Sequence, residues 1–450
     1  MNDTNTVEKT EKPSLAFSVS WALSYQGGAM LIAATISSYF SVFLTDTVGI
    51  PAGAASIMLF IATLWDAIND PIMGTIADRT HTRWGRYRPY FLFFPPLFTA
   101  AAMLVFANPN LPMMGKIVYT EVFYIMWGML YTILTMPWQS VLPAHVKDDN
   151  IRNSLVQAGG TCMAIAFTIA SRFTTNFIAF FGGSYVPLMF IYGAFTCIMY
   201  WILFKTSTER YLMPVEKRSV GEDLKRLIKH KELLTVIIVW MMSSLGYGLM
   251  FGSSVYYIMY YWARPDLIST YMLAVSVGAI VSMMFLMGIL LRIFKGSVVK
   301  AFQFSQGVSM VCYIILFFFG KTNLVLLYAL TFIATSFGAM EQAMINILVN
   351  DTIDYIMLKD KLSLSATISA IKGFAQKCGS TLSNSGILAV LAVTGYVAGA
   401  IGEQPASAMF GINFLRFGLP AATCIIIIAC LAVYPISKYY DEIAEMKKNM

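Results

Sequence analysis

The chain has 450 residues, of which 58% are hydrophobic and only 12% are charged. Soluble globular domains carry about 25% charged residues. The composition therefore excludes a soluble protein and predicts a polytopic membrane protein, in keeping with a mean hydropathy of +0.66. The net charge of +7 does not indicate nucleic-acid binding, because the basic residues form no clustered face on a soluble module.

Twelve segments are apolar and long enough to cross a bilayer as helices, so the predicted fold is an all-α membrane protein with twelve transmembrane helices. In chain order we expect them at 17–44, 53–77, 89–107, 116–143, 154–181, 185–205, 233–262, 268–291, 298–319, 323–349, 363–396 and 408–437. The longest polar stretch divides them into two groups of six, as in transporters that bind their substrate between two lobes. We therefore predict an N-terminal tail (1–16), a six-helix lobe (17–205), a central loop (206–232), a second six-helix lobe (233–437) and a C-terminal tail (438–450).

The orientation in the membrane follows from the distribution of the 31 Lys and Arg residues. If both termini are cytoplasmic, 24 of these residues fall in cytoplasmic segments, three fall in outside loops and four fall within helices. Cytoplasmic loops of membrane proteins carry an excess of Lys and Arg. The sequence therefore predicts a multi-pass protein of the cell membrane with both termini in the cytoplasm.

The residues that most enzymes use are not grouped in this sequence. The three histidines, His81, His145 and His230, lie in predicted cytoplasmic loops, and the six cysteines lie within predicted helices without metal-ligand spacing. No phosphate-binding loop of the G-x-x-x-x-G-K-[ST] type is present. We therefore expect a protein that is not an enzyme, has no cofactor and forms no disulfides.

Two aspartates, Asp66 and Asp70, lie four residues apart within the second predicted helix. This spacing places both carboxylates on one helix face, beside Asn69. A charged group inside a membrane segment costs about 2.5–3.5 kcal/mol on insertion scales and usually marks a functional site. Because two neighbouring carboxylates do not both ionise readily without a bound cation, the pair predicts a site for Na⁺ or H⁺, with Asp66 and Asp70 as the ligands if the ion is sodium. The alternative is a structural ion pair with Lys377.

Other polar residues also lie within predicted helices. Glu341 either lines a substrate cavity or is structural. Glu121 lies near a helix end, where a solvated role is expected. Arg172 and Lys372 either bind an anionic substrate or pair with structural carboxylates.

The residues around the aspartate pair form a longer pattern, which consists of Trp65–Asp70, Pro71–Gly74 and Asp78–Pro89. This pattern resembles the signature of the glycoside–pentoside–hexuronide:cation symporters, a branch of the major facilitator superfamily. Further fragments of the family pattern occur in the same order along essentially the whole chain: Thr45–Gly49, Tyr131–Pro137, Asp351–Tyr355, Phe374–Gly379, Gly395–Tyr396, Arg416–Ala421 and Tyr434–Pro435.

The resemblance implies the major facilitator fold and a secondary active symporter of the bacterial inner-membrane type. Such a protein imports a sugar or glycoside with Na⁺ or H⁺ by alternating access and needs no ATP. Its partners would be the sugar, the monovalent cation and the lipid bilayer, without nucleic acid or an obligatory protein partner. The implied cation site consists of Asp66, Asn69, Asp70 and Thr132, with Lys377 as a counter-charge.

The expected sugar site departs from the family pattern. The first helix has no acidic residue between Ser18 and Leu44, and Thr135 occupies the position of a carboxylate in the fourth helix. Neutral hydroxyl and amide groups suit uncharged sugar hydroxyls. An amphiphile such as a lysophospholipid is the alternative cargo, because sugar-binding carboxylates are missing. The predicted substrate residues are Tyr131, Thr135, Gln139, Glu341, Gln342 and Arg172.

Charged residues at the predicted cytoplasmic face suggest a gate between the lobes. Arg152 begins the fifth helix, and Asp351 and Asp354 end the tenth. The resemblance implies that these charges pair across the lobes when the cavity faces outward. The alternative is that they are ordinary solvated loop charges.

Overall fold

The computed structural model describes residues 13–211, 230–360 and 365–434. These residues are almost entirely helical, and within them the only β-type pairing is an isolated bridge between Thr82 and Gly85. Eleven helical segments of the described chain are long and apolar enough to cross a membrane. The eleventh predicted segment, 363–396, forms a 29-residue helix, α15 (Ser365–Val393), which is too polar to meet the same criterion.

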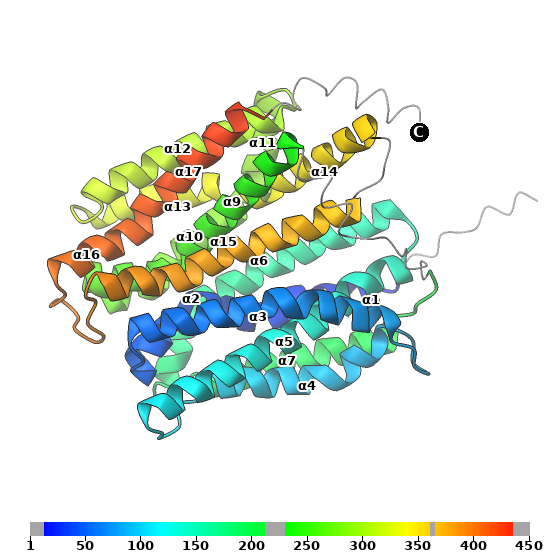
Figure 1. Cartoon of the computed structure of the whole chain (residues 1–450), viewed down its shortest axis with the longest axis horizontal. Coiled ribbons are helices and arrows are strands. Elements are labelled where there is room, and N and C mark those ends of the chain that lie inside the picture. Colours follow the sequence, from blue (N-terminus) through cyan, green and yellow to red (C-terminus); the bar gives the residue numbers. More distant parts are fainter. Residues whose placement is uncertain (1–12, 212–229, 361–364, 435–450) are drawn as a thin grey trace, which may run out of the picture.

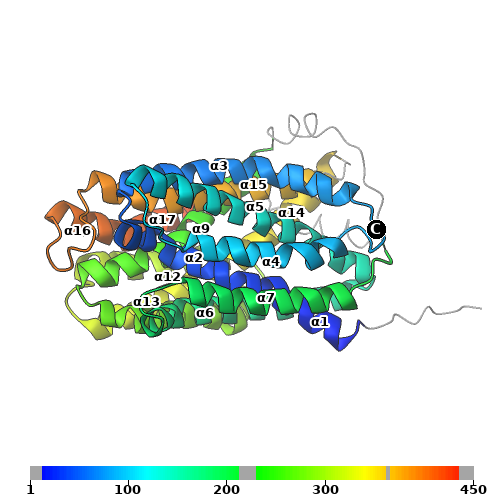
Figure 2. The same ribbon diagram turned by 90° about the horizontal axis from the view of Figure 1, so that it is seen from below.

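The helices form two lobes that lie side by side (Figures 1 and 2). The N-terminal lobe contains α1 (Leu15–Trp21), η1 (Ala22–Ala29), α2 (Met30–Val42), η2 (Phe43–Val48), α3 (Ala52–Arg79), α4 (Arg88–Val105), α5 (Met113–His145), α6 (Asp149–Phe180) and α7 (Val186–Thr206). The C-terminal lobe contains α9 (Lys231–Tyr256), η3 (Tyr257–Tyr261), η4 (Pro265–Leu267), α10 (Ile268–Val281), η5 (Ser282–Leu286), α11 (Met287–Ile293), α12 (Val298–Phe319), α13 (Leu324–Gly338), α14 (Glu341–Asp360), α15, α16 (Ala406–Asn413), η6 (Phe414–Gly418) and α17 (Leu419–Ala432).

Local signals explain several helix ends. The Ser14 side chain accepts a hydrogen bond from the Phe17 amide at the start of α1. The Asn323 side chain accepts one from the Val325 amide at the start of α13, as N-cap residues do. Gly49 ends the first membrane segment in the left-handed conformation, with φ of 83°. A glycine adopts this conformation without the steric penalty of a side chain.

Three prolines do not interrupt the helices that contain them. Pro95, Pro96 and Pro137 all lie within continuous helices. The deviations are wider helical turns such as η1, and a turn at residues 339–340 that separates α13 from α14. Neighbouring helices satisfy the carbonyl groups that a proline leaves free, so proline alone does not determine where a buried helix breaks.

Close packing within each lobe depends on small residues. A Cβ atom added to Gly28 would lie 2.6 Å from the Thr196 hydroxyl of α7, and one added to Gly379 would lie 2.7 Å from the Ser244 Cβ of α9. Small residues allow membrane helices to approach this closely. These contacts fix α7 against η1 and α15 against α9.

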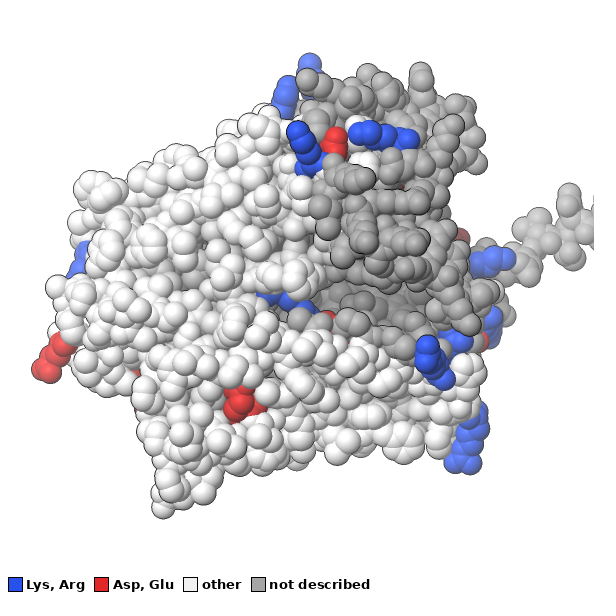
Figure 3. Space-filling view, viewed as in Figure 1, with Lys and Arg blue, Asp and Glu red and all other residues white. Residues whose placement is uncertain are grey.

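The two lobes meet along three pairs of helices: α3 with α15, α6 with α10, and α2 with α9. The Ser56 hydroxyl donates to the Ser385 carbonyl at 2.8 Å across the first pair. The Ser171 and Ser276 hydroxyls lie 2.6 Å apart across the second pair. Figure 3 shows basic and acidic side chains between the two lobes.

Candidate functional site

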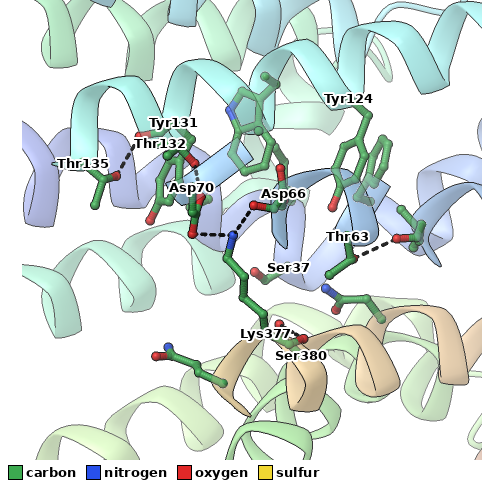
Figure 4. Close-up of a pocket in the computed structure, with 18 of the residues that line it drawn as sticks. Ser37, Thr63, Asp66, Asp70, Tyr124, Tyr131, Thr132, Thr135, Lys377 and Ser380 are labelled. Atoms are coloured by element: carbon green, nitrogen blue, oxygen red, sulfur yellow. Dashed lines mark hydrogen bonds and ion pairs between the residues drawn. The ribbon is translucent and has the colours of Figure 1, made fainter. Parts of the chain in front are cut away.

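A cavity of about 380 Å³ lies between the lobes and contains both predicted aspartates (Figure 4). Helices α2, α3 and α5 form its wall in the N-terminal lobe, and α15 forms its wall in the C-terminal lobe. Its polar lining residues are Ser37, Ser41, Thr63, Asp66, Asp70, Tyr124, Tyr131, Thr132, Thr135, Gln376, Lys377, Ser380 and Asn384.

The aspartates share a network with one lysine and one threonine. Asp70 accepts a hydrogen bond from the Thr132 hydroxyl at 2.9 Å and pairs with the Lys377 ammonium at 2.5 Å. Lys377 also donates to the main-chain oxygen of Asp66 at 2.8 Å. Because Lys377 belongs to α15 and the aspartates belong to α3, the network connects the two lobes (Figure 4).

The packing of α5 against α3 leaves room for the Asp66 carboxylate only because Gly128 has no side chain. A Cβ atom at this position would lie 2.8 Å from the Asp66 Oδ1 atom. Asn69 is on the same helix with 5% of its surface exposed, and its buried side-chain nitrogen has no hydrogen-bond partner among the described residues. Asn69 does not line the cavity, whereas the other three predicted cation ligands do.

This group of atoms has the chemistry of a small cation site. The Asp66 and Asp70 carboxylates and the Thr132 hydroxyl are hard oxygen ligands, which suit Na⁺ and also accept a proton. The Lys377 ammonium occupies the position at which such a cation would compete for Asp70. Cation binding and the ion pair between the lobes are therefore alternatives.

One wall of the cavity is aromatic. The rings of Tyr124 and Trp127 lie 5.9 Å apart, and those of Trp127 and Tyr131 lie 5.5 Å apart, along one face of α5. The Tyr131 hydroxyl lies 2.7 Å from the Tyr25 hydroxyl. A wall of stacked rings opposite hydroxyl and amide groups offers both an apolar face and orienting polar groups, as ligand pockets do.

The structure brings only part of the predicted substrate residues into this cavity. Tyr131 and Thr135 line it, and the Thr135 hydroxyl donates to the Tyr131 carbonyl at 2.7 Å. The predicted residues that do not line it are Gln139, Glu341, Gln342 and Arg172.

The reasons for this placement differ between Arg172 and Glu341. Arg172 lies far along α6 and donates to the Asn176 side chain at 3.0 Å. Glu341 is the first residue of α14 and points into the interior of the C-terminal lobe, where it contacts Gln306 of α12. Sequence position alone does not show which way a side chain turns at a helix break.

Several cavity residues were not predicted from the sequence. Ser380 and Asn384 follow the predicted Lys377 on α15 at spacings of three and four residues, so that all three share one helix face. This polar stripe was visible as a periodic pattern around Lys377. Ser37 and Ser41 form a similar pair on α2.

The predicted gate residues lie in the described chain. Arg152 is in the first turn of α6, and Asp351 and Asp354 are in the second half of α14. Their pairing across the lobes stays a prediction. Lys372 donates to the Asn346 side chain at 2.7 Å, which connects α15 to α14 within the C-terminal lobe.

A separate cluster joins the lobes around Asp46, at the end of the molecule where α3 begins. The Asp46 carboxylate accepts hydrogen bonds from the Tyr260 hydroxyl, from the Tyr396 hydroxyl at 2.9 and 3.0 Å, and from the Gly399 amide at 2.9 Å. The neighbouring Thr45 hydroxyl lies 3.1 Å from that of Tyr256. All of these partners belong to the C-terminal lobe, so one carboxylate holds this end of the two lobes together.

Comparison with known proteins identifies the family. Residues 24–438 match the family described as MFS/sugar transport protein. The chain belongs to this family. It is 25% identical to the inner membrane symporter YicJ of Escherichia coli (strain K12), over 90% of this chain and 87% of that one. It is also 25% identical to an isoprimeverose transporter of Lactiplantibacillus pentosus, over 86% of this chain and 83% of that one.

The fold also agrees with solved structures. A bacterial homologue of the lysosomal transporter Spinster, in an inward-facing conformation, matches 95% of this chain with a TM-score of 0.64 at 13% sequence identity. The predicted membership of the major facilitator superfamily and the predicted all-helical membrane fold are thus confirmed, and the chain is a multi-pass membrane transporter. The number of twelve spanning helices stays a prediction.

Proposed function

We propose that this protein is a secondary active symporter that imports a neutral sugar or glycoside together with a monovalent cation, Na⁺ or H⁺. The observation that carries the proposal is the network of Asp66, Asp70 and Lys377 at the boundary of the two lobes, inside a cavity with an aromatic wall. Relatives described as a symporter and as an isoprimeverose transporter support the cargo class. They do not favour an amphiphile, and nothing in the site suggests an enzyme.

The ion pair gives a physical account of coupling. In the structure Lys377 neutralises Asp70 and ties α15 to α3. A cation that binds between Asp66 and Asp70 displaces the ammonium and releases this tie. A ligand shifts a conformational equilibrium only by its difference in affinity between the two states. Because the Lys377 ammonium competes with the cation for Asp70, the cation binds more tightly to the state in which this ion pair is broken.

The same cavity suits a neutral sugar. At its centre the Lys377 ammonium is already paired with Asp70, whereas Ser37, Ser380 and Asn384 offer uncharged donors and acceptors. Its volume of about 380 Å³ is within the range of small-molecule sites. An anionic sugar bound by Arg172 is not supported, because Arg172 lies outside this cavity.

The orientation of the protein in the membrane follows from the distribution of its Lys and Arg residues. Most Lys and Arg side chains that are visible in Figure 3 gather at the end of the molecule opposite the Asp46 cluster. The positive-inside rule makes this end cytoplasmic. It supports two cytoplasmic termini and an outer end closed by Asp46. The relative described as an inner membrane symporter supports a location in a bacterial inner membrane.

The test is accumulation of substrate in proteoliposomes that contain the purified protein. A panel of neutral sugars and glycosides is first screened for thermal stabilisation, with and without Na⁺ and at two pH values. Asp66→Asn and Asp70→Asn should abolish accumulation of the best ligand against its gradient, while Asp266→Asn should not, because Asp266 pairs with Arg264 in an exposed turn. Wild-type accumulation by both site variants would refute the cation site.

A further inference from the structure

The tenth predicted helix is broken in the interior of the C-terminal lobe. Helix α13 ends at Gly338 and α14 begins at Glu341, although one continuous membrane-spanning segment runs from Leu324 to Ile356. The two residues between them, Ala339 and Met340, are fully buried. In transporters, discontinuous helices of this kind expose helix ends and their first side chains at ion and substrate sites.

The side chain at this break is a buried carboxyl group. Glu341 exposes 7% of its surface, and its Oε2 atom accepts a hydrogen bond from the Gln306 amide at 3.2 Å. The Ser243 hydroxyl of α9 approaches the same carboxyl group. A cavity of about 20 Å³ lies beside it, which is enough space for about one water molecule.

No positive charge balances Glu341 among the described residues. The titratable groups that face it are Tyr247 of α9, Tyr313 of α12 and Cys424 of α17, and all three are neutral in their ordinary state. The fully buried Arg416 of η6 is near Tyr313, but its guanidinium donates to the Tyr271 hydroxyl at 3.0 Å instead.

An isolated carboxylate in such a place is far less stable than a carboxylic acid or a carboxylate with a bound cation. The group that faces the carboxyl oxygen is the amide nitrogen of Gln306, a donor that suits a carboxyl group and not a bound metal ion, which requires oxygen ligands. We propose that Glu341 is a proton-binding site of the C-terminal lobe, separate from the Asp66–Asp70 site, which takes up and releases a proton in the transport cycle. The proton passes between the carboxylate and bulk water by way of the water-sized cavity, so that no other reactant is needed.

This assignment replaces a role for Glu341 in substrate binding, since the residue does not line the cavity between the lobes. Its part in the transport cycle rests on the proposed symport, whereas proton binding itself does not. The two are therefore tested separately.

Proton binding is tested by infrared spectroscopy of the purified protein during a pH titration without substrate. We expect a carboxylic-acid band that is lost reversibly as the pH rises, is missing in Glu341→Gln and is retained in Asp66→Asn. Glu121→Gln is the matched control, because Glu121 is a membrane carboxyl of the other lobe whose buried oxygens have no hydrogen-bond partner among the described residues. Gln306→Leu keeps the carboxyl group and should shift the midpoint of the band's titration.

Three results would overturn the proposal. Glu341 is not a proton site if its band is missing at every pH, and it does not exchange its proton if the band persists at every pH. Loss of the band on adding Na⁺ at constant pH would make it a metal site instead. The role in the transport cycle is tested in proteoliposomes, where Glu341→Gln should lose the pH dependence of the transport rate. Unchanged pH dependence would refute this role. The proposed symport function is decided separately, by the result for Asp66→Asn.

Discussion

Replacing Lys377 by Gln separates cation binding from coupling. In the structure the Lys377 ammonium lies 2.5 Å from the Asp70 carboxylate and 2.8 Å from the Asp66 carbonyl oxygen. A cation must therefore displace the ammonium before the cation can bind. Without the ammonium, the two carboxylates repel each other in the empty site and attract a cation more strongly. We therefore expect Lys377→Gln to bind the coupling cation more tightly than the wild type does, yet to accumulate less substrate.

The magnitude follows from the exposure of the pair. The side chains of Lys377 and Asp70 are 27% and 25% exposed, which is intermediate between a surface pair and a buried one. Exposed pairs contribute about 0.2–1 kcal/mol, and breaking a buried pair costs about 3–5 kcal/mol. A value of about 1–3 kcal/mol corresponds to an increase in cation affinity of roughly 5- to 150-fold.

The assay is thermal stabilisation of the purified protein as a function of Na⁺ concentration and, in parallel, of pH. Lys372→Gln is the control, because Lys372 lies on the same helix but donates to Asn346 and lies 4.4 Å from the Trp240 ring. If Lys377→Gln binds Na⁺ and protons no more tightly than the control, Lys377 does not compete with the cation, and the coupling argument fails.

Three further variants test other parts of the structure. Asp46→Asn weakens the charge-assisted hydrogen bond from Tyr396, so cysteines placed at that end of the cavity should become several-fold more reactive towards a thiol reagent; equal reactivity would show that Asp46 does not hold this end of the lobes together. Gly128→Ala places a methyl group 2.8 Å from the Asp66 carboxylate and should lower cation affinity roughly fivefold or more, measured by Na⁺ titration. Thr135→Ala should change sugar affinity less than about threefold, because its hydroxyl already donates to a main-chain carbonyl; a tenfold loss in equilibrium binding would show that the sugar recruits it.

The sequence by itself determined the class of protein and the family, and it predicted where the cation site lies. Apolar segments long enough to cross a bilayer have few stable folds besides membrane helices. The spacing of Asp66 and Asp70 lies within a single helix, where 3.6 residues per turn place both carboxylates on one face. Their connection to Thr132 and to Lys377 entered from the family resemblance, and the structure places both in contact with Asp70.

Only the tertiary structure decided which residues face the cavity and which do not. Glu341 and Arg172 are polar residues in apolar helices, and the sequence offered no means to distinguish a cavity between the lobes from the interior of one lobe. The Asp46 cluster joins residues more than 200 positions apart in the chain. Such contacts depend on how helices rotate and where they break, and helix rotation is set by packing against neighbours that no local pattern encodes.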